Sequence, residues 1–163
     1  MKYFEDIRVG DVYEVGRYTF TADNIKAFAT RFDPQSFHVD EAAAARSHFG
    51  ALVASGWHTA VAWMRLMIDY RRRMDEAMRA RGEPVAGIGP ALGFRELKWL
   101  KPVYVGDTIA YKSEVIETRL SNSRPGCGLM TFRSTGINQN GEPVISLVSI
   151  TFVERRPSAM GQL

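Results

Sequence analysis

Residues 55–64 read Ser55-Gly56-Trp57-His58-Thr59-Ala60-Val61-Ala62-Trp63-Met64, and this run decides the fold. It is apolar nearly all round a helix, whereas beyond Arg65 apolar and charged side chains alternate in an amphipathic pattern. The run is too short to span a membrane and holds polar side chains, so it predicts a buried helix. A helix of this kind must be covered on most of its sides.

Strands are the elements that could cover this helix. Gly82 to Gly93 is rich in glycine and proline and predicts a flexible connection after it. Asn140-Gly141 indicates a tight hairpin near the end of the chain. Segments rich in β-branched and aromatic residues predict one strand before the helix and four after it: Val12 to Phe20, Phe94 to Leu100, Thr108 to Thr118, Leu129 to Asn138 and Pro143 to Glu154.

Two shorter helices are expected before the long one. Thr21 or Asp23 caps a helix that runs to about Phe32, and Pro34 ends it. A second short helix follows Asp40-Glu41, whose acids favour its first turn. One helix that needs cover and strands on both sides of it in the sequence predict an α+β domain. In such a domain an antiparallel sheet curls around the helix.

The whole chain, residues 1–163, is predicted to form a single domain. Apolar residues make up 45% and charged residues 24%, a balance that excludes disorder and low complexity. The single cysteine, Cys127, has no neighbouring Cys/His pair, so neither an internal disulfide nor a metal site is expected. The charged run from Met1 to Arg8 lacks the apolar core of a signal peptide, and a cytoplasmic protein without a membrane segment is expected.

The net charge of +3 is only mildly basic. Its one dense cluster, Arg71-Arg72-Arg73, stands beside Asp69 and Asp75. This pattern favours a solvated helix face, with a site for anionic phosphates as the second interpretation. A nucleic-acid partner is not expected.

The segment Asp33-Pro34-Gln35-Ser36-Phe37-His38 places an acid and an imidazole five positions apart, where Pro34 is expected to hold the chain extended. The helix start at Ser55-Gly56 offers free backbone amides to a developing oxyanion. Together these groups predict a proton-transfer site with an electrophilic partner. Taken singly, Asp33 could merely start a turn and His38 could be a core histidine.

The run from Phe32 to Met67 resembles the MaoC-like dehydratases, also called R-specific enoyl-CoA hydratases. Asp33 and His38 fall on the family's two catalytic positions, and Gly56 on the glycine whose N–H serves as oxyanion donor. Gln35-Ser36 replace a common Asn-Pro, and Ser55 stands where many members have histidine. The stretch from Glu96 to Val115 extends the resemblance, which implies the hot-dog fold.

The resemblance implies a hydro-lyase that interconverts 2-enoyl-CoA and R-3-hydroxyacyl-CoA by syn addition of water, without metal or redox cofactor. An imidazole is largely neutral at pH 7, so His38 is expected to accept the water proton. Asp33 is expected to hold the water and deliver the proton to carbon, which requires burial to make its protonated form accessible. Gly56 N–H is the expected oxyanion donor, with space beside it for the acyl group.

The candidate substrate-binding residues surround the expected helix start. Ser55 favours an N-cap over a nucleophile, and His58 could line the pocket or be structural. The apolar candidates could shape an acyl tunnel or simply belong to the core. The predicted substrate-binding set is Phe37, Leu52, Ser55, Trp57 and His58.

Two other functions compete with the hydro-lyase. A hot-dog thioesterase would use an acid, often on the central helix, but this helix carries no Asp or Glu before Asp69. A non-catalytic acyl-CoA-binding protein would not need both Asp33 and His38. A homodimer is expected because a single curled sheet leaves exposed strand edges and a half-open cleft.

Overall fold

A five-stranded antiparallel sheet in the order β1-β3-β4-β5-β2 forms the body of the protein in a computed structural model that describes residues 2–157. The order arises because β3, β4 and β5 form a meander, while β1 and β2 join its two edges. The elements are η1 (Phe4–Asp6), β1 (Val12–Thr19), α1 (Ala22–Phe32), α2 (Ser36–Val39), α3 (Glu41–Arg46), α4 (Gly56–Ala80), β2 (Ile88–Trp99), β3 (Thr108–Leu120), β4 (Cys127–Ile137) and β5 (Pro143–Glu154).

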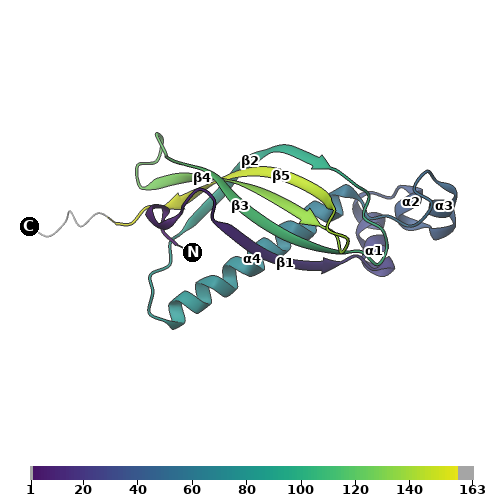
Figure 1. The fold of residues 1–163 in the computed structure, drawn as a ribbon, viewed down its shortest axis with the longest axis horizontal. Coiled ribbons are helices and arrows are strands. Elements are labelled where there is room, and N and C mark those ends of the chain that lie inside the picture. The colour runs from purple at the N-terminus through teal and green to yellow at the C-terminus, as the bar shows by residue number, and fades with distance from the viewer. Residues whose placement is uncertain (1, 158–163) are drawn as a thin grey trace, which may run out of the picture.

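The long helix α4 runs along the curved sheet, and α1, α2 and α3 gather at the end opposite the first and last described residues (Figure 1). Ala62 and Trp63 of α4 are buried in one core cluster with Val15, Tyr111 and Leu147 of the strands. The hydroxyl of Tyr111 donates to the carbonyl of Thr59 at 3.0 Å, which ties β3 to the helix. An antiparallel sheet wrapped around a long helix is the hot-dog arrangement, so the predicted fold is confirmed.

The strand β2 begins at Ile88, six residues before the predicted start at Phe94. The prediction of a flexible connection is therefore wrong for its second half, which belongs to β2. Residues in this glycine- and proline-rich part pair with β5, although the register shifts repeatedly along the ladder. Such a sequence is tolerated because β2 is an edge strand, where a proline need not donate to a second neighbour. Pairing with β5 has therefore overridden the local preference for a loop.

The predicted N-termini of the two short helices are confirmed. The side chain of Thr21 accepts from Asn24 N–H at 3.3 Å and caps α1, and Asp40 accepts from Ala43 N–H at 2.9 Å and caps α3. The expectation of an extended segment up to His38 is wrong, because residues from Ser36 to Val39 form the short helix α2. Pro34 restrains only the residue before it, and the chain is free to turn afterwards.

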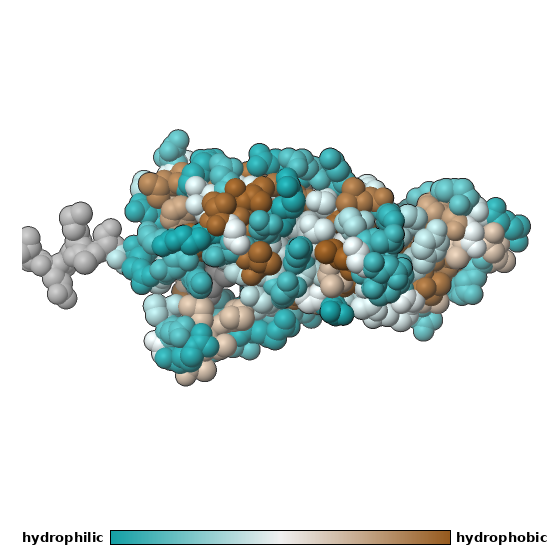
Figure 2. Space-filling model, viewed as in Figure 1, coloured by the Kyte–Doolittle hydropathy of each residue, from teal (hydrophilic) through white to brown (hydrophobic). Residues whose placement is uncertain are grey.

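The apolar half of α4 is covered less than its sequence predicts. Trp57, Val61 and Met64 are 56%, 40% and 46% exposed, because the sheet covers the helix from one side only. Their spacing of four and three residues places them on one stripe of the helix. Figure 2 shows further apolar patches among hydrophilic surface. This uncovered stripe motivates the homodimer, which remains a prediction.

Within residues 2–157, no helix combines the length and the apolar composition that a bilayer crossing needs.

Candidate active site

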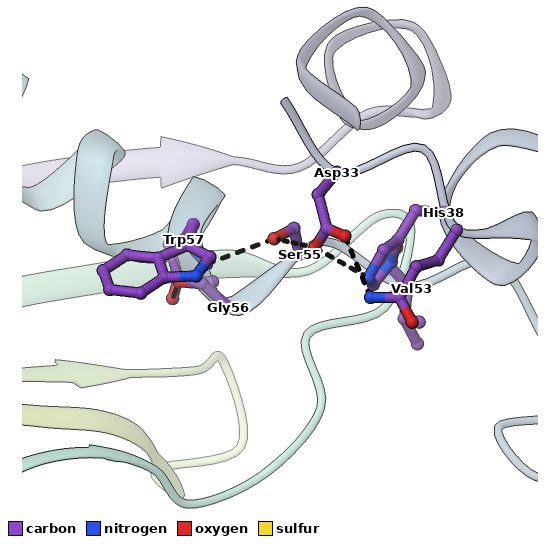
Figure 3. A network of polar contacts seen from close by, with 8 residues as sticks. Asp33, His38, Val53, Ser55, Gly56 and Trp57 are labelled. Atoms are coloured by element: carbon purple, nitrogen blue, oxygen red, sulfur yellow. Dashed lines mark hydrogen bonds and ion pairs between the residues drawn. The ribbon is translucent and has the colours of Figure 1, made fainter. Parts of the chain in front are cut away.

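Asp33 and His38 lie on either side of the turn between α1 and α2. Asp33 is the C-cap of α1, where its N–H donates to the carbonyl of Ala29 at 2.8 Å. His38 lies within α2 and is only 5% exposed. The two side chains point toward one another and toward Ser55 at the start of α4 (Figure 3).

The imidazole of His38 is fixed by a backbone contact. Its Nδ1 lies 2.7 Å from the carbonyl oxygen of Val53, and because a carbonyl only accepts, Nδ1 carries the proton of this hydrogen bond. Nε2 then faces Asp33, whose Oδ2 lies 3.5 Å away. In the neutral imidazole, Nε2 is the acceptor. The geometry thus presents a base and a carboxylate to the same small volume.

The carboxylate of Asp33 is held from two sides. The hydroxyl of Ser55 donates to Oδ2 at 2.6 Å, and the side-chain amide of Gln35 donates to Oδ1 at 2.9 Å. The hydrogen bond from Ser55 holds the pKa of the Asp33 carboxyl below its ordinary value, against the opposing effect of burial, and Gln35 and His38 add to the lowering. The expectation that burial makes the protonated acid accessible is therefore wrong. Asp33 is ionised at neutral pH.

Ser55 links the carboxylate to the helix. It is 1% exposed, and besides donating to Asp33 its Oγ accepts from the N–H of Trp57 at 3.2 Å. This second bond is the predicted N-cap of α4. One hydroxyl thus fixes both the helix start and the position of the acid.

Gly56 is the first residue of α4, so its N–H belongs to the amides that the helix itself leaves without a partner. The space expected beside it is already filled. A Cβ at Gly56 would lie 2.5 Å from Cε2 and Nε1 of Trp99. The glycine is therefore required by the close approach of the Trp99 indole, which also packs edge-on against Trp57 at 5.2 Å between centroids.

The site opens into a cleft of about 480 Å³ that has both polar and aromatic walls. The structure brings six of the predicted site residues together in its lining, and these are Asp33, Phe37, His38, Ser55, Gly56 and Trp57.

The structure does not bring Leu52 or His58 into this lining. Leu52 is a core residue with 3% exposure. His58 points away from the cleft, where its ring stacks on Phe28 at 4.6 Å and meets Phe20 edge-on at 4.9 Å. Burial lowers the pKa of His58 to about 4, so its imidazole is neutral over the physiological range.

Sequence reasoning missed three residues of the site. Gln35 was noted only as a departure from a motif, although an amide two residues after an acid in a turn was a usable signal. Trp99 lies 43 residues beyond Gly56, in the stretch that extends the family resemblance, but nothing local places its ring over the glycine. The carbonyl of Val53 lies only two residues before Ser55, but a backbone acceptor carries no signal in the residue type.

The model of the MaoC-like domain family matches residues 7–131, which is most of the chain. This protein belongs to the MaoC-like domain family. A MaoC-like dehydratase from Rhodospirillum rubrum superposes with a TM-score of 0.79 at 40% identity, over 96% of this chain and 99% of that one. An (R)-hydratase from A. caviae superposes with a TM-score of 0.61 over 93% and 99% of the two chains, but at 22% identity it shows the fold alone.

Among curated proteins, mesaconyl-CoA hydratase from Cereibacter sphaeroides is 43% identical over 68 residues. That match spans 42% of this chain and only 20% of the hydratase. Protein MaoC of Klebsiella aerogenes is 33% identical over 112 residues, or 29% of its own length. The chain therefore spans under a third of these two relatives. The family and its hydratase members support a hydratase or dehydratase in the broad sense.

In the part of the chain that the structure describes, no group of three or more His, Cys, Asp or Glu side chains is arranged to hold a metal ion. That the reaction needs no metal or redox cofactor stays a prediction.

Proposed function

We propose that this protein is a hydro-lyase that interconverts a 2-enoyl-CoA and its R-3-hydroxyacyl-CoA by syn addition of water. One observation carries the proposal: Nε2 of His38 and Oδ2 of Asp33 lie 3.5 Å apart in a cleft at the start of the long helix. An imidazole nitrogen that can accept, beside a carboxylate, is an arrangement that would hold a water molecule by both of its protons.

Water addition begins with that molecule. As its oxygen bonds to the β-carbon of the enoyl group, the proton on the Nε2 side passes to His38. The imidazolium that forms is stabilised by the negative charge on Asp33. The other proton stays on the oxygen and becomes part of the product hydroxyl.

Protonation of the α-carbon completes the reaction. Because the pKa of Asp33 is lowered, the carboxylate holds no proton to give, and the proton instead comes from the imidazolium of His38. Asp33 orients the water and stabilises the charged intermediate, and His38 returns to its neutral form. Both new bonds form on the face of the substrate that meets His38, which gives syn addition.

Negative charge on the thioester oxygen needs a donor. The N–H of Gly56 stands at the positive end of the 25-residue helix α4, where a partial positive charge favours an oxyanion. Because the Trp99 indole occupies the space over Gly56, the acyl group must enter beside this ring or displace it.

The substrate class follows from the cleft and the relatives. Phe37, Phe49 and Trp57 give the lining apolar surface suited to an acyl group. Lys101 also lines the cleft, and it would have to leave its ion pair with Glu142 to meet an anionic carrier. A CoA thioester is the substrate of the curated mesaconyl-CoA hydratase by its name, and we carry this class over to the present chain. We further propose a cytoplasmic homodimer that needs no metal or redox cofactor, formed through the uncovered stripe of α4.

Crotonyl-CoA hydration tests the proposal. The wild-type protein should remove the enoyl absorbance without release of free thiol, because hydration leaves the thioester intact. Asp33→Asn and His38→Ala should each lower the rate by about 10²–10⁴-fold while the fold is kept. Asp23→Asn, a matched change in the first turn of α1, should leave the rate unchanged.

The opposite outcomes are equally clear. Release of thiol at the rate of enoyl loss would make the protein a thioesterase. Wild-type turnover in either purified site variant would refute the roles given to Asp33 and His38.

A further inference from the structure

A second cavity, of about 160 Å³, lies between α4 and the sheet and shares no lining residue with the cleft that holds Asp33 and His38. Its walls come from the middle of α4 and from all five strands. Along α4, Arg71 of this cavity stands 15 residues beyond Gly56, or about 22 Å at about 1.5 Å per residue. The cavity is close in volume to the ~150 Å³ apolar cavity that admits benzene.

Four buried polar atoms belong to residues that line this cavity. Tyr13 Oη, Trp63 Nε1, Arg71 Nε and Ser149 Oγ are shielded from solvent and have no hydrogen-bond partner among the described residues. Trp63 and Ser149 are 5% and 1% exposed as whole residues. Buried polar groups in proteins are nearly always hydrogen-bonded. Four unpaired polar atoms around one cavity therefore indicate that a hydrogen-bonding partner fills it.

The chemistry of these atoms defines that partner. The N–H groups of Trp63 and Arg71 only donate, and a hydroxyl such as that of Ser149 donates or accepts. Burial raises the pKa of Tyr13 to about 12, so its phenol keeps its proton and donates as well. No Asp or Glu of the described chain lines the cavity, and the guanidinium of Arg71 is positive. The complementary group is an anionic acceptor.

Most of the remaining lining is apolar and includes Met67, Met130 and Phe132, while the hydroxyls of Ser113 and Thr151 already have hydrogen-bond partners in the fold. We propose that this cavity binds a carboxylate carried on a short aliphatic or aromatic body. The carboxylate oxygens accept from Trp63 and Arg71 while the body contacts the apolar wall. Ile68, which is 47% exposed and is not one of the three residues through which the homodimer is proposed to form, marks the mouth through which such a ligand enters.

Two sources could supply the carboxylate. It is either a free carboxylic acid or the distal end of a dicarboxylic acyl thioester, and the second source rests on the proposed function. An acyl thioester bound in the catalytic cleft could reach the cavity along an apolar groove. This groove shares Trp57 with the cleft, and Met64 and Phe94 with the cavity.

Indole NMR gives a readout that does not depend on activity. In uniformly ¹⁵N-labelled protein, with the three indole signals assigned by single substitutions, hexanoate at millimolar concentration should shift the Nε1–H signal of Trp63 in a saturable way. Methyl hexanoate, which has the same body without the charge, should bind at least tenfold more weakly. Equal binding of the ester would overturn the proposal and leave a merely apolar cavity. An unshifted Trp63 signal would mean that ordered water satisfies these groups.

Matched variants locate the contact. Arg71→Met should weaken hexanoate binding at least tenfold, whereas Arg72→Met, its exposed neighbour outside the cavity, should leave it unchanged. Ser149→Ala should weaken binding without lowering the unfolding temperature, because it removes a hydroxyl that has no partner in the fold. Equal effects of the two arginine changes would refute a site in the cavity.

Inhibition of crotonyl-CoA hydration separates the two sources. Competitive inhibition by hexanoate assigns the cavity to the far end of the substrate. Binding seen by NMR with no effect on hydration assigns it to a free acid. If no hydration is found at all, the NMR titration still decides whether the cavity takes a carboxylate.

Discussion

Replacement of Ser55 by alanine tests how the acid of the site is held. The change removes two hydrogen bonds from one buried atom: the 2.6 Å bond to Oδ2 of Asp33 and the 3.2 Å bond from the N–H of Trp57. A hydrogen bond to a charged group contributes about 1.5–3 kcal/mol and a helix cap about 1 kcal/mol. Water entering from the cleft recovers part of the first, so we expect the free energy of unfolding to fall by roughly 2–3 kcal/mol.

The same change alters the chemistry. Ser55 is the largest cause of the lowered pKa of Asp33, so without it that pKa rises toward its ordinary value. In the proposed mechanism hydration needs the ionised carboxylate, so the acidic limb of the rate profile should move to higher pH. At neutral pH kcat/KM should fall about tenfold, because the carboxylate loses the donor that fixes its position, while Ser55→Thr, which keeps a hydroxyl, should retain most activity.

Urea unfolding and a pH–rate profile on crotonyl-CoA measure these effects. A Ser55→Ala protein that loses stability but keeps both its rate and its acidic limb would mean that the hydroxyl is only a helix cap. That result would refute the claim that Ser55, at the start of α4, also controls the position and the pKa of the Asp33 carboxylate.

Three further outcomes are expected. Gly56→Ala should abolish most activity through a clash with Trp99, and adding Trp99→Ala should restore the unfolding temperature; an unrestored double variant would place the defect elsewhere. Because the pKa of His58 falls from 6.5 to about 4 on folding, the unfolded state binds more protons below pH 6.5. The contribution of His58 to the free energy of unfolding should thus be constant above that pH and fall by up to roughly 3 kcal/mol as pH falls to 4. Chemical denaturation of His58→Gln should show a smaller loss of stability over the same pH range. Light scattering should give a dimer, and Val61→Glu should yield a monomer; a monomeric, fully active wild type would contradict the homodimer.

The order and type of the main elements were readable from local patterns. The apolar run from Ser55 to Met64 predicted the long helix, and the strands after residue 107 lie within about two residues of their predicted ends. Periodicity and turn residues act over short stretches of chain, so they are visible without the rest of the fold. The beginning of β2 was not visible, since only pairing with β5 makes a glycine-rich segment a strand.

The sequence by itself named the groups that are proposed to carry the chemistry. Asp33, His38 and Gly56 were named from their types, their spacing and a family resemblance, and the fold places all three in one cleft. Their electrostatic state was not determined, because it depends on donors such as Ser55, 22 residues from Asp33 along the chain. The tertiary structure alone decided that the pKa of Asp33 is lowered by Ser55 rather than raised by burial, and it buried His58 among aromatic rings away from the cleft. Charge and burial are set by neighbours in space, and a linear pattern does not contain them.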